Sequence, residues 1–218
     1  MTNDEAHQRF YVEPAVAFIR GTRDDAPELP DGVLIVWGKA AGLRIHRFKR
    51  SGVLPRVQRI IGFLHAIRPD SLLDIGSGRG TALWPMMDSL TELDFTSTEL
   101  HPERLKDLRA VSAGGLERLC VIESDAQALD LPADSIGAVT LLEVLEHMPD
   151  PLAAMRRALS VSRGFIAITV PSKEDNNPEH IHLFTRTSLT DMLREAGARR
   201  VQVEYILNHI IAFARSTR

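Results

Sequence analysis

The stretch that decides the fold is Leu72-Leu73-Asp74-Ile75-Gly76-Ser77-Gly78-Arg79-Gly80. It begins as a short apolar strand, passes an acidic residue and enters a loop with glycine at every second position. Glycine has no Cβ atom, so such a loop can turn sharply and let a ligand approach the backbone. The helix expected behind it, at residues 81–89, offers backbone N–H groups to a polar ligand. The stretch therefore predicts a ligand-binding loop at the end of a strand.

The spacing of the glycines separates two classes of nucleotide-binding loop. Nicotinamide-dependent enzymes carry the pattern Gly-x-Gly-x-x-Gly, and Thr81 stands where that pattern needs its third glycine. Asp74, inside the motif, suits a ligand with an ammonium group better than it suits a pyrophosphate. The loop therefore favours a partly cationic ligand.

Strands and helices alternate regularly on both sides of this loop. Apolar runs predict five strands, at residues 72–75, 93–98, 119–122, 136–142 and 165–170. Residues 201–207 and 209–214 predict an antiparallel pair at the sheet edge. Helical spacing or helix-start signals lie between the runs, so we expect an α/β fold with a doubly wound sheet and ligands at the carboxyl ends of its strands.

Acidic residues follow the predicted strands in order. Glu99 closes the second strand, where a carboxylate can accept the ribose hydroxyls of a nucleoside. Asp125 and Ala126 follow the third strand, where a carboxylate could meet an adenine amino group. Glu143 follows the fourth. Each acid alone is as well explained by a turn or the surface, but their order after consecutive strands predicts one nucleoside site.

With these residues the chain resembles the class I S-adenosylmethionine-dependent methyltransferases, over roughly residues 53 to 215. The glycine loop matches the first motif of that family, Glu99 its second-strand acid and Ser124-Asp125-Ala126 its adenine-side motif. The resemblance implies a seven-stranded Rossmann-like sheet with an antiparallel last strand, and S-adenosylmethionine as cofactor. The cofactor-binding residues it implies are Asp74, Gly76, Ser77, Gly78, Gly80, Glu99, Asp125, Ala126 and Glu143.

Residues around the fourth strand predict how the methyl acceptor is handled. Methyl transfer is an in-line displacement, and an oxygen acceptor must also lose its proton. If the chain turns helical after this strand, Glu143, Glu146 and His147 share one helix face. Completed by His182, they would form an oxygen and nitrogen site for a divalent metal such as Mg or Mn. Without a metal, His147 or His182 could act as the general base.

This part of the chain resembles the small-RNA 3′-terminal ribose 2′-O-methyltransferases. Glu143-Val144-Leu145-Glu146-His147 matches their first metal segment, and His182-Leu183-Phe184 matches their later His-x-Phe segment. Some ubiquinone-pathway O-methyltransferases are similar here. His180 lies close to His182 in the sequence, but only His182 fits the His-x-Phe pattern, so His182 is favoured over His180.

Three functions therefore stay open. The first is an enzyme that methylates a small molecule on oxygen, and the second is a metal-dependent methyltransferase of an RNA 3′-terminal ribose. The third is a methyltransferase-like protein that binds the cofactor without chemistry. A net charge of −3 argues against bulk nucleic-acid binding. The RNA alternative is favoured by a basic stretch free of acids, with Arg44, Arg47, Lys49, Arg50 and Arg56.

The rest of the chain carries fewer signals. Residues 1–52 do not follow the strand and helix alternation and are predicted to form an appendage that covers the active site, ahead of a cofactor-binding domain at residues 53–218. The single cysteine, Cys120, lies in an apolar run and is expected to be a buried thiol. His7, His65 and His209 are expected to be ordinary surface or core residues. No signal peptide or membrane span is predicted, which favours a cytoplasmic protein.

Overall fold

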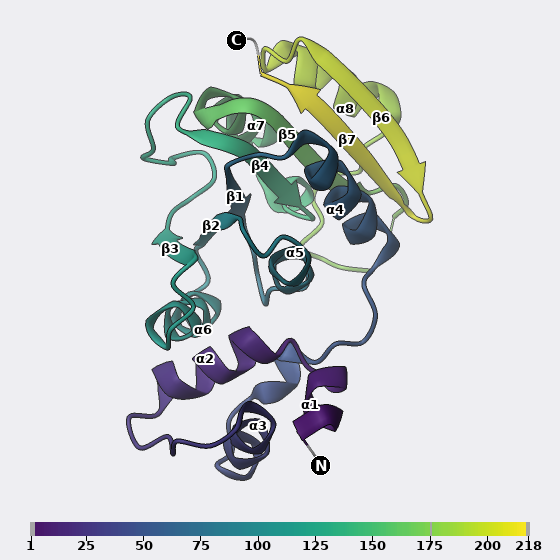
Figure 1. The fold of residues 1–218 in the computed structure, drawn as a ribbon. Helices are drawn as coiled ribbons and strands as arrows, with labels where there is room; N and C mark the ends of the chain where they lie inside the picture. The colour runs from purple at the N-terminus through teal and green to yellow at the C-terminus, as the bar shows by residue number, and fades with distance from the viewer. Residues whose placement is uncertain (1–2, 175, 217–218) are drawn as a thin grey trace.

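The computed structural model describes residues 3–174 and 176–216. A seven-stranded sheet runs through it in the order β3-β2-β1-β4-β5-β7-β6 (Figure 1). Strands β1 to β5 are parallel, and β7 is antiparallel to both β5 and β6. The predicted seven-stranded sheet with a closing antiparallel pair is therefore confirmed. The strand bounds are β1 Ser71–Ile75, β2 Asp94–Glu99, β3 Leu119–Glu123, β4 Ile136–Leu142, β5 Ser162–Pro171, β6 Arg200–Ile206 and β7 His209–Arg215.

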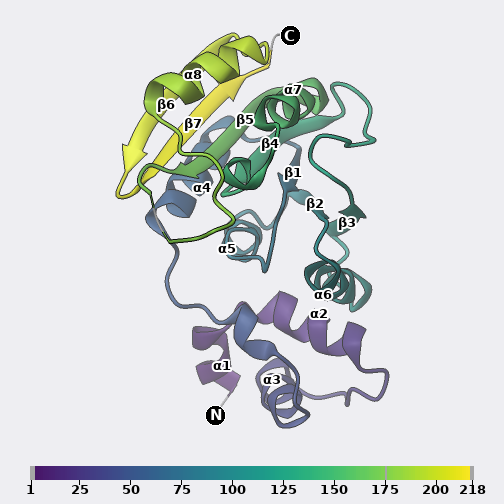
Figure 2. The same cartoon turned by 180° about the vertical axis from the view of Figure 1, so that it is seen from behind.

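Helices cover both faces of this sheet (Figures 1 and 2). Alternate side chains of each central strand point to opposite faces: Leu72 packs into one apolar cluster, whereas Leu73 and Ile75 pack into the other. The doubly wound arrangement is thus confirmed. The first cluster includes residues of α4 Pro55–Ile67, α5 Leu83–Ser89 and α6 Pro102–Ala113, and the second those of α7 Pro151–Val161 and α8 Arg186–Glu195.

The strand order positions the site. From β1 the chain moves outward to β2 and β3, then returns to the other side of β1 as β4. The connections after β1 and β4 therefore diverge, which opens a crevice at the carboxyl ends of these two strands. The glycine loop follows β1, and Glu143 follows β4.

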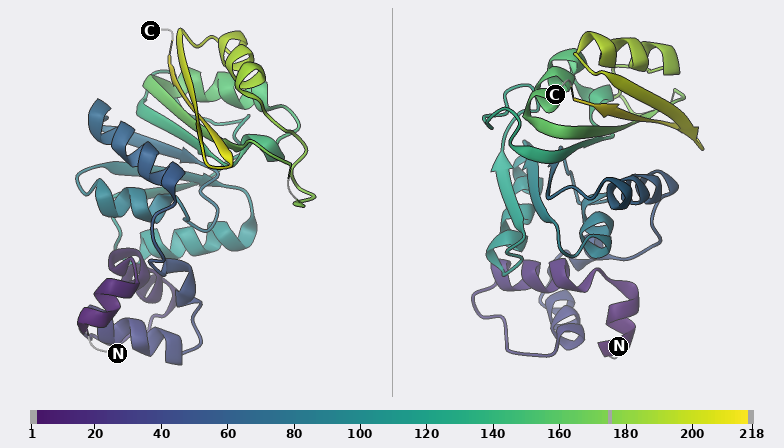
Figure 3. Two further views of the ribbon diagram at one scale, coloured as in Figure 1. Left: turned by 90° about the vertical axis from the view of Figure 1, so that its right-hand side faces the viewer. Right: turned by 45° about the horizontal axis from the view of Figure 1, so that its top comes forward.

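The N-terminal region forms three helices, α1 Asn3–Arg9, α2 Val12–Thr22 and α3 Asp31–Ala40, and the 3-10 turn η1 Ile45–Phe48. They lie together at the end of the molecule opposite β6 and β7 (Figure 3). Helix α2 crosses α6 at two glycines: a Cβ atom on Gly21 would stand 1.8 Å from the Ala110 carbonyl oxygen, and one on Gly114 would stand 1.8 Å from that of Ala17. Only glycine permits this close approach, so the region docks firmly on α6.

The cover over the active site expected of residues 1–52 stays a prediction. None of the described residues 3–52 lines the main cavity of the protein. Instead, the buried Phe48 of η1 packs on Trp84 of α5, with 5.4 Å between ring centroids. The region therefore supports the helix behind the glycine loop.

The environment of Cys120 differs from the expectation. Its thiol is exposed rather than buried. The reason is the strand order, because β3 is an outermost strand of the sheet and only part of its surface is covered.

Candidate functional site

The glycine loop is shaped by two contacts. The Gly76 N–H donates to the Thr98 carbonyl at 2.9 Å, which ties the loop to the end of β2. Gly80 has a φ of 81°, and a Cβ atom on it would stand 2.1 Å from the Trp84 indole. The same indole donates its Nε1–H to the Arg79 carbonyl at 3.0 Å. Trp84 thus fills the space behind the loop and holds its last turn.

Asp74 lies at the end of β1 beneath this loop and is 2% exposed. Its two carboxyl oxygens accept hydrogen bonds from the hydroxyls of Thr140 and Ser77, both at 2.6 Å. Burial raises the pKa of Asp74 to about 6 and outweighs these hydrogen bonds, which lower it; the charge of Glu99 raises it further. Two acids close together in a buried place favour a cationic ligand, as a sulfonium with an ammonium group would be.

Glu99 is held by the backbone at the end of β2. One oxygen accepts the Gly78 N–H at 2.9 Å, and the other accepts the N–H groups of Leu100 and His101 at 2.9 and 2.8 Å. These bonds fix the carboxylate next to the glycine loop. A carboxylate has about four acceptor positions, so it can also accept a ligand hydroxyl.

One cavity of about 790 Å³ joins these groups. It runs along the carboxyl ends of β1, β2, β3 and β4, so it includes the crevice expected from the strand order. Gly80 is not among its lining residues, since it faces Trp84 instead. The predicted cofactor-binding residues that do line it are Asp74, Gly76, Ser77, Gly78, Glu99, Asp125, Ala126 and Glu143.

The chain does not continue as a helix after β4. Glu143 has a φ of 59°, in the left-handed region, and only Leu145–His147 form a 3-10 turn, η2. Glu143 is held there by its N–H, which donates to the Thr169 carbonyl at 2.9 Å. The expectation that Glu143, Glu146 and His147 share one helix face is therefore wrong.

Glu143 instead meets two residues from distant parts of the sequence. Its Oε1 lies 3.6 Å from Nε of Arg56, in the first turn of α4, and its Oε2 lies 3.1 Å from Nε2 of His209, at the start of β7. The sequence alone predicted His209 to be an ordinary surface or core residue. Its position depends on the pairing of His209 with Pro171 at the end of β5, and no local pattern reveals that pairing.

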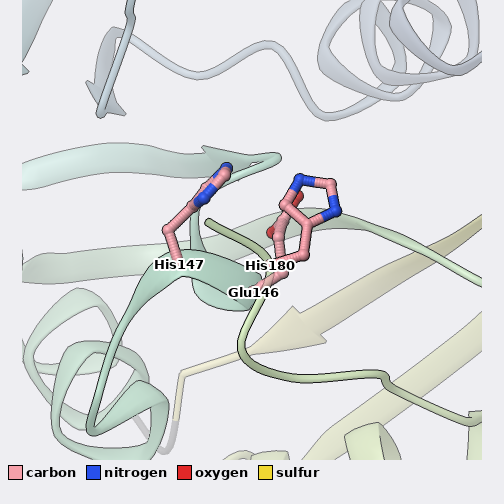
Figure 4. A group of neighbouring side chains, drawn as sticks. All are labelled: Glu146, His147 and His180. Atoms are coloured by element: carbon pink, nitrogen blue, oxygen red, sulfur yellow. The ribbon is translucent and has the colours of Figure 1, made fainter. Parts of the chain in front are cut away.

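Glu146 and His147 lie together with a different histidine from the one expected. Ligand atoms of Glu146, His147 and His180 lie within 4.8 Å of one another (Figure 4). The His147 Nδ1 lies 3.1 Å from the Glu179 carbonyl, to which it can only donate, so in the neutral imidazole Nε2 carries the lone pair. A buried carboxylate with two imidazoles is a donor set that suits a divalent transition metal.

Two predicted metal ligands lie outside this group. Glu143 is excluded by the backbone turn just described. His182 directs its Nε2 to the Met148 carbonyl at 2.8 Å, and it does not line the cavity. The backbone explains why His180 rather than His182 joins Glu146 and His147. The N–H groups of Ile181 and His182 both donate to the Glu146 carbonyl and fix the loop there. Metal binding itself stays a prediction.

No helix among the described residues combines the length and the apolar character that a membrane crossing needs.

A protein-family model described as "Methyltransferase domain" matches residues 45–203. A ubiquinone biosynthesis O-methyltransferase of Xanthomonas campestris pv. campestris (strain B100) is 35% identical over 96 residues, which are 41% of this chain and 37% of that protein. The enzyme of the same name from Xanthomonas oryzae pv. oryzae (strain PXO99A) is 36% identical over 91 residues, or 39% and 35% of the two chains. These matches thus span little more than a third of each relative.

Solved structures share the fold at low sequence identity. A SAM-dependent methyltransferase from Aquifex aeolicus has a TM-score of 0.60 at 15% identity, with 77% of this chain and 93% of that chain covered. An O-methyltransferase family protein from Burkholderia thailandensis has a TM-score of 0.60 at 18% identity, with 74% and 55% covered. The [4+2]-cyclase SpnF reaches 0.59 at 15% identity, with 73% and 81% covered. The likeness therefore concerns the fold, which different chemistries use.

Proposed function

Since this chain belongs to the methyltransferase domain family, we propose that it transfers the methyl group of S-adenosylmethionine to a hydroxyl oxygen of a small molecule. The observation that carries the proposal is the composition of the cavity. All of the residues concerned line it. In the strand order β3-β2-β1-β4, the acids Asp125, Glu99 and Asp74 come from the first three strands and mark one end, and the possible proton acceptors Glu143 and His147 follow β4 at the other. A cofactor and an acceptor can therefore meet between them.

S-adenosylmethionine supplies an electrophilic methyl group on a positively charged sulfur. Asp74 and Glu99 favour that charge, and the Glu99 carboxylate, held by three N–H groups, orients the ribose. Asp125, whose Oδ1 accepts the Gln127 N–H at 2.8 Å, is held at the adenine end. The protein's main task is alignment, because the in-line displacement needs reacting atoms close together and in line.

A small-molecule acceptor is favoured over RNA because arginines of the basic stretch form ion pairs within the chain. Arg47 pairs with Asp107, Arg50 with Asp88 at 2.5 Å and Arg56 with Glu143. These cations are already matched by acids of the same chain, which weakens their attraction for phosphates. The relatives named ubiquinone biosynthesis O-methyltransferases also support oxygen as the methylated atom.

The metal prediction belongs to this proposal in a revised form, with Glu146, His147 and His180 as the residues that would hold Mg or Mn. The metal would lower the pKa of an acceptor hydroxyl. The RNA alternative requires such a metal, whereas small-molecule transfer can proceed without one.

One experiment tests the function. Transfer of labelled methyl groups would be measured over a panel of phenols, catechols, aliphatic alcohols and RNA 3′ ends, with EDTA and with added Mn²⁺. We expect turnover of a hydroxyl-bearing small molecule and none of RNA. Transfer to RNA alone would contradict the small-molecule assignment. Cofactor binding by calorimetry without turnover of any acceptor would favour a non-catalytic protein.

A further inference from the structure

Arg56, Glu143 and His209 form a cluster where three elements meet: the first turn of α4, the end of β4 and the start of β7. The three residues come from segments far apart in the sequence, and each side chain is about one-fifth to one-quarter exposed. Their convergence at the end of the cavity that holds Glu143 and His147 indicates a role in handling the acceptor.

The cluster spans the wall of the cavity. Arg56 and Glu143 line the cavity, whereas His209 is not among its lining residues. The His209 side chain is 23% exposed, so it reaches solvent while Nε2 stays 3.1 Å from Oε2 of Glu143. A path for a proton therefore leads from the cavity through the carboxylate to the imidazole and the outside.

One oxygen of the Glu143 carboxylate, Oε1, is buried and lacks a hydrogen-bond donor within the described part of the chain. Nε of Arg56 lies 3.6 Å from it, which supplies charge but not a hydrogen bond. An unsatisfied buried acceptor is costly, and the hydroxyl of a methyl acceptor is a donor that would satisfy it.

The backbone at Glu143 supports a functional reading of this oxygen. A φ of 59° is unfavourable for a residue with a Cβ atom, and such strain collects at active sites. The strained turn directs Glu143 toward Arg56 and His209, whereas a helix would have placed it with Glu146 and His147.

Resting on the proposed function, we propose that Glu143 receives the hydroxyl proton of the methyl acceptor and that His209 carries this proton to solvent. As the acceptor oxygen bonds to the methyl carbon, the bond from that carbon to sulfur breaks, and its electron pair stays on sulfur as neutral S-adenosylhomocysteine. The hydroxyl proton moves to Oε1 of Glu143. The neutral carboxyl group turns to present this proton to Nε2 of His209, in the tautomer that carries its hydrogen on Nδ1. Nε2 takes the proton, Nδ1–H is released to water, and Glu143 is again a carboxylate. The imidazole returns to its first tautomer by proton exchange with solvent.

The surrounding charges suit these roles. Burial lowers the pKa of His209, and Arg56 lowers it further, while the Glu143 carboxylate opposes both effects. The lowered pKa favours the neutral imidazole, which is the form that can accept a proton. Two further charged groups on the packed elements, Arg59 of α4 and Glu204 of β6, pair with each other at 2.6 Å.

His209 acts through Glu143, so it is a positioning and proton-carrying residue, and the test must separate this role from a structural one. His209→Ala is compared with His65→Ala, whose imidazole lies near the other end of α4 and contacts Ser89. We expect His209→Ala to lower kcat about tenfold, with the Kd of the cofactor unchanged within about twofold. Added imidazole should restore much of the rate, while His65→Ala should behave as the unchanged protein.

A second measurement does not depend on turnover. The pKa of His209 would be followed by NMR of the ring nitrogens in the unchanged protein and in Glu143→Gln, where loss of the carboxylate should lower it further. An equal pKa in both would overturn the relay, as would full activity of His209→Ala from pH 6 to 8 or a lost rate that imidazole cannot restore. A different result separates the two proposals: if the pKa of His209 does fall in Glu143→Gln but the unchanged protein methylates no acceptor, then the proposed function is wrong and the coupling of the two residues stands.

Discussion

The two ends of the cavity are built in different ways. At the cofactor end, the glycine loop and Glu99 are held mainly by backbone groups of the same short segments or of adjacent strands. At the acceptor end, side chains converge from α4, β4, η2, β7 and the loop that carries His180. The difference teaches that an end built from backbone turns is visible as a motif, whereas an end built from converging side chains is not.

The two ends also differ in their support. Behind the glycine loop lies a row of rings, in which Phe18 packs on Phe48 at 5.2 Å and Phe48 on Trp84. At the acceptor end, ion pairs rather than packed rings support the site. We therefore expect changes at the cofactor end to alter affinity, and changes at the acceptor end to alter rate.

The largest effect should come from Glu143→Gln. The amide cannot take the acceptor's proton, so kcat should fall roughly 10²-fold, while the Kd of S-adenosylmethionine stays within about twofold. Single-turnover kinetics and calorimetry check both values. A large loss of cofactor affinity would place Glu143 with the cofactor end and remove the separation between the two ends.

Gly80→Ala should change the affinity for the cofactor rather than the rate of methyl transfer. Its Cβ atom would overlap the Trp84 indole, so the ring must move and the bond to the Arg79 carbonyl must break. We expect a cofactor Kd raised about tenfold, equivalent to one lost hydrogen bond of about 1.4 kcal/mol, with kcat at saturation retained. Trp84→Phe, which keeps a ring but lacks the N–H, should show a smaller loss. Unchanged affinity in both variants would contradict a role of this support.

The affinity for the cofactor should depend on pH through Asp74, whose pKa burial raises to about 6. The ionised form attracts the cationic cofactor, so lowering the pH from 7 to 5 should weaken binding up to about tenfold. Asp74→Asn should bind more weakly at pH 7 and show little pH dependence. A wild-type Kd that is constant over this range would show that the Asp74 charge does not act on the ligand.

The same shift has a consequence for folding. A carboxyl whose pKa is raised in the folded state contributes to stability below its unfolded pKa, near 4, and this contribution is lost as the pH rises through about 6. Asp74→Asn should therefore gain stability relative to the unchanged protein over this interval.

The smallest effect is expected for Arg59→Ala, one turn along α4 from Arg56. Arg59 pairs with Glu204 at 2.6 Å and lies 4.8 Å from the centroid of the Phe213 ring, at about one-third exposure. Its loss should lower the free energy of unfolding by about 1 kcal/mol or less and leave kcat unchanged, as thermal unfolding and initial rates would show. A drop in kcat would mean that the position of α4, rather than the chemistry of Arg56, limits the acceptor end.

The sequence by itself determined the architecture and most of the cofactor end. Leu72 to Gly80, Glu99 and Asp125 are readable because alternating apolar runs define the strands and a glycine loop is a local backbone requirement. Cys120 shows the limit of prediction from the sequence, since its exposure depends on which strand is outermost in the sheet.

Only the tertiary structure decided the acceptor end. The left-handed turn at Glu143 separated this residue from Glu146 and His147, the loop after β5 brought His180 rather than His182 to them, and the β5–β7 pairing delivered His209. Each outcome depends on hydrogen bonds between segments far apart in the chain. Because a residue's neighbours across a sheet are set by pairing and not by spacing, these contacts leave no periodic signal in the sequence.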